Sequence, residues 1–431
     1  MLKQLLGFDK KQHDLRTEIV AGVTTFLTMA YILIVNPMVM SDAGMDQSVA
    51  FTATALASAL GTMLVAFIAK MPLAQAPGMG INTFFAYTLV GAMGYTWQTA
   101  LTVTFVEGLF FIFITVLNIR EKFISAIPST LRTAMSVGIG FFIAFIGLQS
   151  SGIIVGNEAT LVRLADFNPS NLLAIFGIFA CGIMLHLKIK GALFLGVVLT
   201  TVLSFVCGVS TMPANFSPVA LPSSIESVLF QFDFRSLMSL ELIIVIFTVA
   251  FVDIFDTMAT LIGVSISGGF VEDDGKITRA KQVLLSDAIA TTAGSMLGAT
   301  TVTTYVESLS GIAAGGKSGL TAFVVGALFL LSLIFAPLFM LVPSIATAGV
   351  LVMVGVLMLS GVKKIDTPNI AESLPAFLTI IVMLLSYSLS EGIAAGMISY
   401  VVFRLFTPER RELTTVQVVV AAAFVLRYII K

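Results

Sequence analysis

Long apolar runs, separated by short stretches of charged and turn residues, repeat from one end of the chain to the other. A helix of about 20 predominantly apolar residues is long enough to cross a bilayer. The pattern therefore predicts an all-α polytopic membrane protein with fourteen transmembrane segments. The expected spans are residues 18–41, 49–69, 77–93, 97–118, 130–149, 171–187, 191–208, 240–264, 281–298, 303–316, 318–335, 341–360, 370–388 and 391–405.

Spans 3 and 10 are the weakest hydrophobic segments in this pattern. Pro77, Gly78 and Gly80 disrupt a helix in span 3. The β-branched run 300–304, at the start of span 10, favours extended backbone. We expect a short extended piece followed by a half-helix in each. Paired interrupted segments at corresponding positions indicate the binding site of a transporter.

Fourteen spans divide into two sets of seven, and an odd number per half makes the halves insert with opposite orientation. Residues 57–66 in span 2 resemble residues 290–299 in span 9, and Thr28-Met29-Ala30 has a counterpart in Thr257-Met258-Ala259. These matches predict an inverted repeat. The first repeat is expected at residues 1–208, with spans 1–7, and the second at residues 240–405, with spans 8–14.

Composition and charge placement agree with this interpretation. Hydrophobic residues make up 58% of the 431 and charged residues 11%, against about 25% charged in soluble domains. With the N-terminus inside, 21 of the 23 basic residues fall in cytoplasmic segments, and only Arg163 and Arg235 lie outside. Because positive charge resists translocation, we expect both termini in the cytoplasm. Residues 406–431 are expected to form an amphipathic helix on or beneath the cytoplasmic face.

Three carboxylates, Asp253, Asp256 and Glu307, lie in stretches that otherwise indicate membrane interior. A charge at that depth costs at least ~2.5–3.5 kcal/mol on insertion scales, so it usually faces a cavity or a site. We interpret the three as the substrate-binding and proton-coupling centre of a transporter.

Glu307 is expected near the N-terminus of the second half-helix, where the helix dipole favours an anion. A carboxylate there can accept two N–H bonds from a planar heterocycle. Asp253 and Asp256 are three residues apart and can point to one side of span 8. They either bind a proton together, or one binds substrate while the other fixes span 8 to its neighbours. Asp253 is the favoured substrate ligand.

Other polar and aromatic residues near the breaks complete the candidate substrate site. Asn82 offers a donor and an acceptor suited to a base edge, Phe84 a stacking face, and Thr28 a hydroxyl in span 1. Gly80 belongs to the same break. Glu107 in span 4 and Asp287 in span 9 are interpreted as structural partners.

No zinc-ligand spacing or nucleophile arrangement occurs, so we expect neither a metal, a cofactor nor an enzyme. Residues 311–318 match the letters of a phosphate-binding loop, but they lie between two membrane segments, and we reject nucleotide binding.

Four motifs resemble the adenine/guanine/hypoxanthine permeases, the AzgA-like purine branch of the nucleobase:cation symporters. They are Arg16–Pro37, Ala76–Asn82, Phe251–Thr257 and Pro375–Ile381. The resemblance implies two inverted seven-span repeats arranged as a core and a gate domain that interleave both repeats. It also implies proton-coupled purine uptake and, in many members, a homodimer. In the wider superfamily, acidic residues on spans 8 and 10 bind the base; they correspond to Asp253 and Glu307.

The expected function is secondary active import of purine nucleobases, namely adenine, guanine or hypoxanthine, by proton symport with alternating access. The expected location is the cell inner membrane, with lipid, proton and base as partners and no nucleic acid. Two alternatives stay open. One is a transporter of uracil, xanthine or a small anion on the same scaffold, although carboxylates repel anions. The other is a cation channel with the three carboxylates as its filter.

Overall fold

The computed structural model describes residues 5–9, 13–117, 128–213, 216–270, 277–386, 388–407 and 413–430. Within these ranges, seven helices are long and apolar enough to cross a membrane, and three shorter apolar helices accompany them. The prediction of an all-α membrane protein is confirmed.

The first half of the chain contains thirteen described elements that carry expected spans 1–7. They are α2 (Leu15–Met29), α3 (Ile32–Asp42), α4 (Gln47–Leu64), η1 (Val65–Ala69), β1 (Gln75–Pro77), α5 (Met79–Thr83), η2 (Phe84–Ala92), α6 (Trp97–Val116), α8 (Ser129–Ser150), β2 (Ile154–Asn157), β3 (Leu161–Leu164), α9 (Pro169–His186) and α10 (Ala192–Val206).

The second half carries expected spans 8–14 and a C-terminal helix. Its described elements are η3 (Arg235–Met238), α11 (Leu240–Gly268), α12 (Ala280–Met296), β4 (Val302–Thr304), α13 (Ser308–Ala313), α14 (Gly319–Ser332), η4 (Leu333–Phe335), α15 (Ala336–Met340), α16 (Ser344–Met358), η5 (Leu359–Lys364), α17 (Ile370–Leu385), α18 (Leu389–Leu405) and α19 (Thr415–Ile430). Every expected span coincides, within a few residues, with one or more of these elements.

The two broken spans meet in the interior. Strand β1 pairs with β4 in antiparallel register, with Gln75 opposite Thr304 and Pro77 opposite Val302. The short helix α5 follows β1, and α13 follows β4. The expected extended piece and half-helix are therefore present in both spans. Unwound backbone at this depth is tolerated because the two strands satisfy each other's polar groups.

Equivalent threonines anchor the two strands. The Thr62 hydroxyl of α4 donates to the Gln75 carbonyl (2.9 Å) and accepts from its N–H (3.0 Å). The Thr291 hydroxyl of α12 makes the same two bonds with Val302, at 3.0 and 3.1 Å. This symmetry supports the inverted repeat. In the structure, Thr62 corresponds to Thr291. The matched sequence motifs instead align Thr62 with Ser295, one helical turn further along α12.

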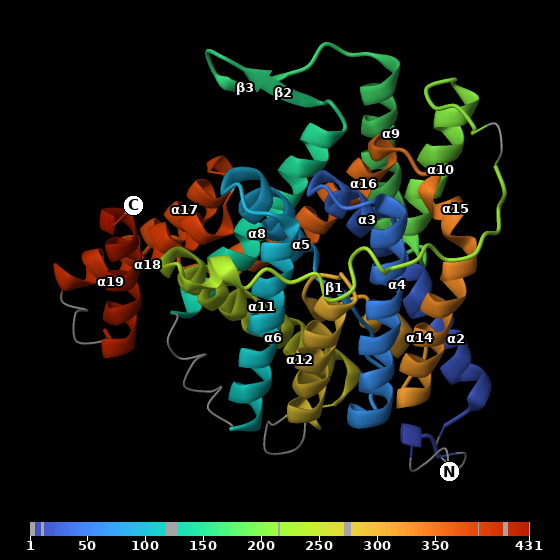
Figure 1. The fold of residues 1–431 in the computed structure, drawn as a ribbon, viewed down its shortest axis with the longest axis horizontal. Coiled ribbons are helices and arrows are strands. Elements are labelled where there is room, and N and C mark those ends of the chain that lie inside the picture. The colour runs from blue at the N-terminus through green and yellow to red at the C-terminus, as the bar shows by residue number, and fades with distance from the viewer. Residues whose placement is uncertain are drawn as a thin grey trace.

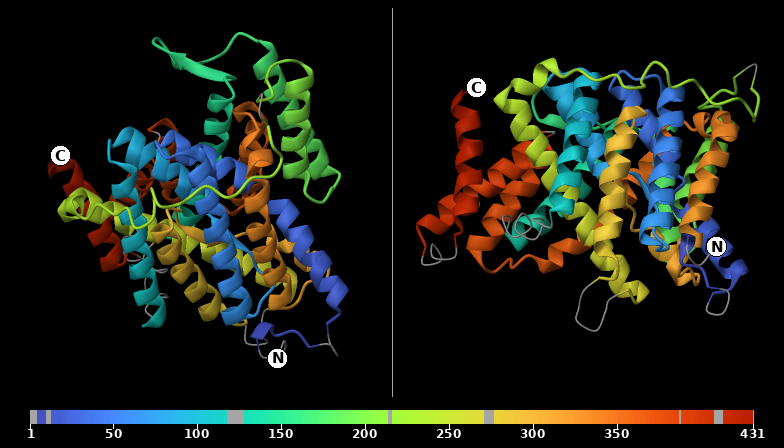
Figure 2. Two further views of the ribbon diagram at one scale, coloured as in Figure 1. Left: turned by 45° about the vertical axis from the view of Figure 1, so that its right-hand side comes forward. Right: turned by 60° about the horizontal axis from the view of Figure 1, so that its bottom comes forward.

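Helix packing follows the same two-fold pattern. Helices α6, α12, α4 and α14 stand side by side, with α2 beyond α14 (Figure 1). In this row, the α4–α14 pair corresponds to the α12–α6 pair. In a second group, α8 packs on α16 and α17 while α16 also packs on α9, and again the contacts correspond between halves (Figure 2).

The C-terminal helix α19 packs along α18 at one edge of the molecule (Figure 1). The Tyr428 hydroxyl donates to Glu391 in the first turn of α18, so the two helices run antiparallel. The outward side of α19 is apolar, with Val419 61% exposed, whereas Gln417 is buried. The placement of residues 406–431 relative to the membrane stays a prediction.

Candidate functional site

The predicted site residues gather around the crossing of β1 and β4. The Gly78 N–H donates to the Thr301 carbonyl (2.9 Å), and the Tyr305 N–H donates to the Ala74 carbonyl (2.9 Å). The Tyr305 hydroxyl donates to the Pro77 carbonyl (2.5 Å). These bonds extend the ladder beyond the strands and fix where both half-helices begin.

Glu307 lies immediately before α13, at the half-helix N-terminus where the sequence predicts it. Its Oε1 accepts a hydrogen bond from the Tyr31 hydroxyl at 2.7 Å. Tyr31 is fully buried at the break between α2 and α3. A break in span 1 thus positions the donor that orients the acid of span 10, an interaction that the sequence analysis missed.

Thr28 connects span 1 to the same half-helix. Its Oγ1 lies 2.8 Å from Ser310 Oγ in α13 and donates to the Thr25 carbonyl (2.7 Å). Ser310 Oγ in turn lies 2.7 Å from the Glu307 carbonyl. In this conformation the Thr28 hydroxyl joins two helices beside Glu307, and a role in substrate contact stays a prediction.

Asp253 lies on α11, fully buried, with the Thr257 hydroxyl 3.4 Å from its Oδ1. Its side chain also interacts with that of Glu107 on α6. Glu107 is fully buried, and its Oε2 accepts from the Thr301 hydroxyl at 2.8 Å. A structural role is expected of Glu107 from the sequence, yet Glu107 contacts a predicted site residue. Asp256 belongs to α11, but its side chain lies outside what the structure describes.

Asn82 is fully buried in α5, close to the same segment. Its Oδ1 accepts a hydrogen bond from the Thr300 hydroxyl. Its Nδ2 has no hydrogen-bond partner among the described residues. Consecutive threonines, Thr300 and Thr301, therefore bind Asn82 and Glu107. Their hydroxyls were the available signal, but only the backbone preference of this run entered the sequence prediction.

Gly80 and Phe84 occupy packing positions. A Cβ on Gly80 would lie 2.7 Å from Ile139 Cγ2, so this glycine lets α5 approach α8 closely. Phe84 is fully buried and lines a small cavity on the α11 side. The other residues around that cavity are Ile81, Thr248, Val249, Val252 and Leu389.

Asp287 ties the strands to α12. Its Oδ1 accepts from the Gln75 amide and from the Thr304 hydroxyl (3.0 Å). These contacts agree with the structural role expected of Asp287.

Glu18 explains the residues that resemble a phosphate loop. Its carboxylate accepts from the backbone N–H of Lys317 (3.2 Å) and Ser318 (3.4 Å), and from the Thr321 hydroxyl. A protein carboxylate therefore holds the N-terminus of α14, where a phosphate would bind in a nucleotide site. Across the described ranges, no group of histidine, cysteine and acidic residues is arranged to hold a metal.

Comparison with known proteins decides the family. A model of the permease family matches residues 16–395. The chain belongs to the permease family. It is a membrane transporter and not an enzyme.

Among relatives of this permease, the adenine permease AdeQ of Escherichia coli (strain K12) is 40% identical, with 100% of this chain and 96% of that protein covered. The guanine/hypoxanthine permease PbuG of Bacillus subtilis (strain 168) is also 40% identical, covering 99% of each chain. The transmembrane domain of the cyanobacterial bicarbonate transporter BicA has the same fold, with a TM-score of 0.65, 16% identity, and 89% of this chain and 97% of that chain covered.

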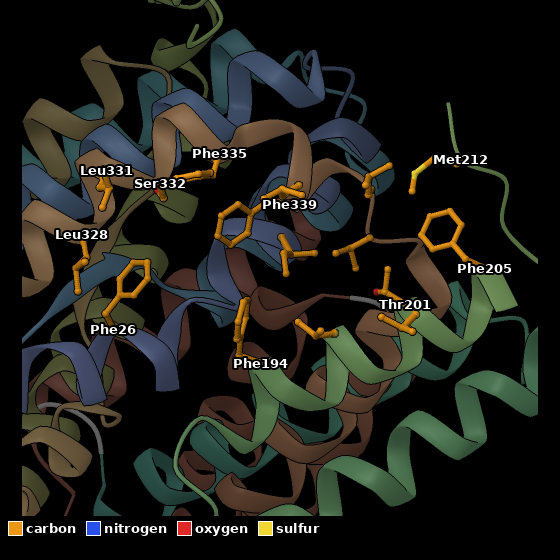
Figure 3. A pocket seen from close by; sticks show the side chains of 16 residues that line it. Phe26, Phe194, Thr201, Phe205, Met212, Leu328, Leu331, Ser332, Phe335 and Phe339 are labelled. Atoms are coloured by element: carbon orange, nitrogen blue, oxygen red, sulfur yellow. The ribbon is translucent and has the colours of Figure 1, made fainter. Parts of the chain in front are cut away.

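Two cavities of the permease lie away from the buried acids. One, of about 550 Å³, is almost wholly apolar and lies between α2, α10, α14 and α15. Figure 3 shows Phe26, Phe194 and Phe339 around it, with Thr201 and Ser332 as polar residues. The other, of about 640 Å³, is more polar and lies between α3 and η2 on one side and α8 and α16 on the other. No predicted site residue lines either cavity.

Proposed function

We propose that this permease imports purine nucleobases, namely adenine, guanine or hypoxanthine, by proton symport with alternating access. The observation that carries the proposal is 40% identity, over almost the entire chain, to proteins named adenine permease and guanine/hypoxanthine permease. The resemblance to a bicarbonate transporter supports the fold alone, because identity is only 16%.

Recognition of the base is assigned to Glu307 and Asn82. A carboxylate at the start of a half-helix accepts N–H donors of a planar ring, and the Tyr31 hydroxyl orients it. The buried amide of Asn82 supplies a donor for a ring nitrogen or carbonyl oxygen. We assign Asp253 to proton coupling, on the side of α11 that faces the substrate. A neutral ring meets no repulsion from these acids, whereas an anion does.

Transport follows from movement between two groups of helices. We assign α2–α6 and α11–α14 to a core, and α8–α10 and α16–α18 to a gate. The 640 Å³ polar cavity between α3, η2, α8 and α16 lies between them and supports access from the outer side. A proton entering down one pH unit supplies about 1.4 kcal/mol, and a potential of 100 mV adds ~2.3 kcal/mol per charge.

The proposed location is the cell inner membrane with both termini cytoplasmic, because this orientation keeps nearly all basic residues on one side. The homodimer implied by the resemblance stays a prediction.

Uptake of labelled bases tests the function. Cells lacking their own purine permeases are transformed with this gene or with empty vector, and initial rates are measured for labelled adenine, guanine and hypoxanthine at two external pH values. We expect saturable uptake that is faster at the lower pH and competed by unlabelled purine. Uptake competed only by uracil or xanthine would show that the substrate is one of those bases and not a purine of the proposed set. A non-saturable cation current would show that the protein acts as a channel.

A further inference from the structure

Glu107 is a buried acid that recognition of a base at Glu307 does not use. It lies near the middle of α6 and is fully buried. Its Oε2 accepts from the Thr301 hydroxyl at 2.8 Å. Its Oε1 accepts a hydrogen bond from no donor group of the described residues. The group that its carboxyl does meet is the carboxyl of Asp253.

Contact between these two carboxyl groups calls for a proton. Two ionised carboxylates repel each other strongly where water is excluded, and a hydrogen bond between carboxyl groups exists only when one of them is protonated. No ion pair to Glu107 is found in the part of the chain that the structure describes. A single proton shared between Glu107 and Asp253 therefore gives Oε1 of Glu107 a hydrogen-bond partner and removes the repulsion between the two carboxylates.

Charged residues on the helices around α6 act elsewhere along its length. Glu241 of α11 accepts from the Tyr95 hydroxyl (3.0 Å), just before α6 begins. Lys281 of α12 approaches the Val116 carbonyl (3.5 Å), at the last residue of α6. At 1.5 Å per residue, these positions are about 18 and 13 Å along the axis from Glu107.

Asp287 of α12 is bound by Gln75 and Thr304. Among the described residues, the other titratable groups next to α6 are Asp233, which accepts from Thr99 at 3.2 Å, Tyr87 of η2, which donates to Asp42, and exposed Arg235 of η3. The side chain of Asp256 lies outside what the structure describes.

We propose that Glu107 and Asp253 together hold the transported proton, separately from Glu307, which binds the base. This inference rests on the proposed proton symport. The ionised pair takes one proton from the outer side, shares it while the core moves, and releases it inside. Proton and base then occupy different sites in one core.

The threonine pair connects the two sites. Thr301 binds Glu107 through its hydroxyl and the Gly78 N–H through its carbonyl, at the start of α5. Its neighbour Thr300 binds Asn82 within α5. A change in the protonation of Glu107 therefore alters the hydrogen bonding of the segment that positions Asn82. This path links proton binding to the geometry of the half-helix.

Purified protein in proteoliposomes separates coupling from binding. Two quantities are measured with a labelled purine that the wild type transports: exchange without a gradient, and accumulation driven by an imposed pH gradient. We expect the ratio of accumulation to exchange to fall at least tenfold in Glu107→Gln. The matched control is Glu18→Gln, a buried glutamate that caps α14, which keeps the wild-type ratio. An unchanged ratio in Glu107→Gln would overturn the inference.

Infrared spectroscopy tests the pair without transport. Wild-type protein at neutral pH should show the C=O band of a protonated carboxyl group, and Glu107→Gln should lose intensity there while Glu18→Gln does not. A wild-type spectrum lacking that band overturns the shared proton, even if Glu107→Gln does not fold. If wild-type protein exchanges base but does not accumulate it under a pH gradient, the proposed proton symport is wrong, whatever the role of Glu107.

Discussion

The hydroxyl of Tyr31 and the carboxylate of Glu307 form a direct contact between the first and second halves at the candidate site, at 2.7 Å. Hydrogen bonds to a charged group contribute about 1.5–3 kcal/mol. The bond fixes the direction in which Glu307 presents its oxygens at the start of α13. In the proposed site, recognition of a flat ring depends on that direction.

Glu307→Gln should reduce purine uptake at least tenfold. An amide has one acceptor oxygen and introduces two donors, so it cannot accept a pair of N–H groups as a carboxylate does. Initial rates of labelled uptake, normalised to the amount of protein in the membrane, measure the effect. Wild-type rates in Glu307→Gln would contradict the assignment of Glu307 to base recognition.

Tyr31→Phe is a milder change at the same place. It removes the orienting donor and keeps the carboxylate, so KM should rise roughly 3–10-fold, equivalent to about 0.5–1.5 kcal/mol, while the maximal rate changes less. Competition curves with unlabelled base measure KM. An unchanged KM would show that Tyr31 does not orient Glu307 for substrate.

The two strands depend on threonine hydroxyls that replace missing backbone partners. Thr62→Val and Thr291→Val should each lower the free energy of unfolding by about 1–3 kcal/mol, because a buried N–H and C=O lose their partner. Equal effects are expected, since the two sites correspond by symmetry. The measurement is thermal unfolding in detergent.

Thr104→Val is the matched control for this pair, because among the described residues the Thr104 hydroxyl bonds only the Ala100 carbonyl of its own helix (3.2 Å). The free energy of unfolding of Thr104→Val should be closer to that of wild type than those of the two test variants. Strongly unequal effects of the two test substitutions would contradict the equivalence of the strands.

Hydrophobic length and helix-breaking residues were sufficient to predict the spans and both interrupted segments. Proline and glycine, such as Pro77 and Gly78, disfavour regular helix. The position of such a break can therefore be predicted from the local sequence. The Tyr31–Glu307 and Glu107–Asp253 contacts join residues 276 and 146 positions apart. No short-range pattern predicts which buried acid meets which partner across such separations. For that reason, the sequence did not predict the contact between Glu107 and Asp253.

The proposed alternating access requires the proposed core and gate to move against each other, and Gly80 lies where α5 of the one meets α8 of the other. Gly80→Ala places a methyl group 2.7 Å from Ile139 Cγ2, and overpacking of this kind costs about 1–3 kcal/mol. Uptake should fall several-fold. Ile139→Ala in the same protein should restore it, because the space opens again.

Uptake and purine binding are measured in the single and double variants, with protein amount as the control. Failure of Ile139→Ala to restore any activity would show that Gly80 is needed for something other than close approach of α5 to α8.

The antiparallel ladder also constrains how the molecule is made. Pro77 pairs with Val302, so β1 leaves the ribosome 225 residues ahead of its partner. Until β4 arrives, the exposed edge of β1 must be satisfied by water or by other proteins, since lipid offers no hydrogen bonds. The ladder therefore closes only after β4 has been made. A fragment that stops before β4 inserts its helices but never assembles the centre of the protein.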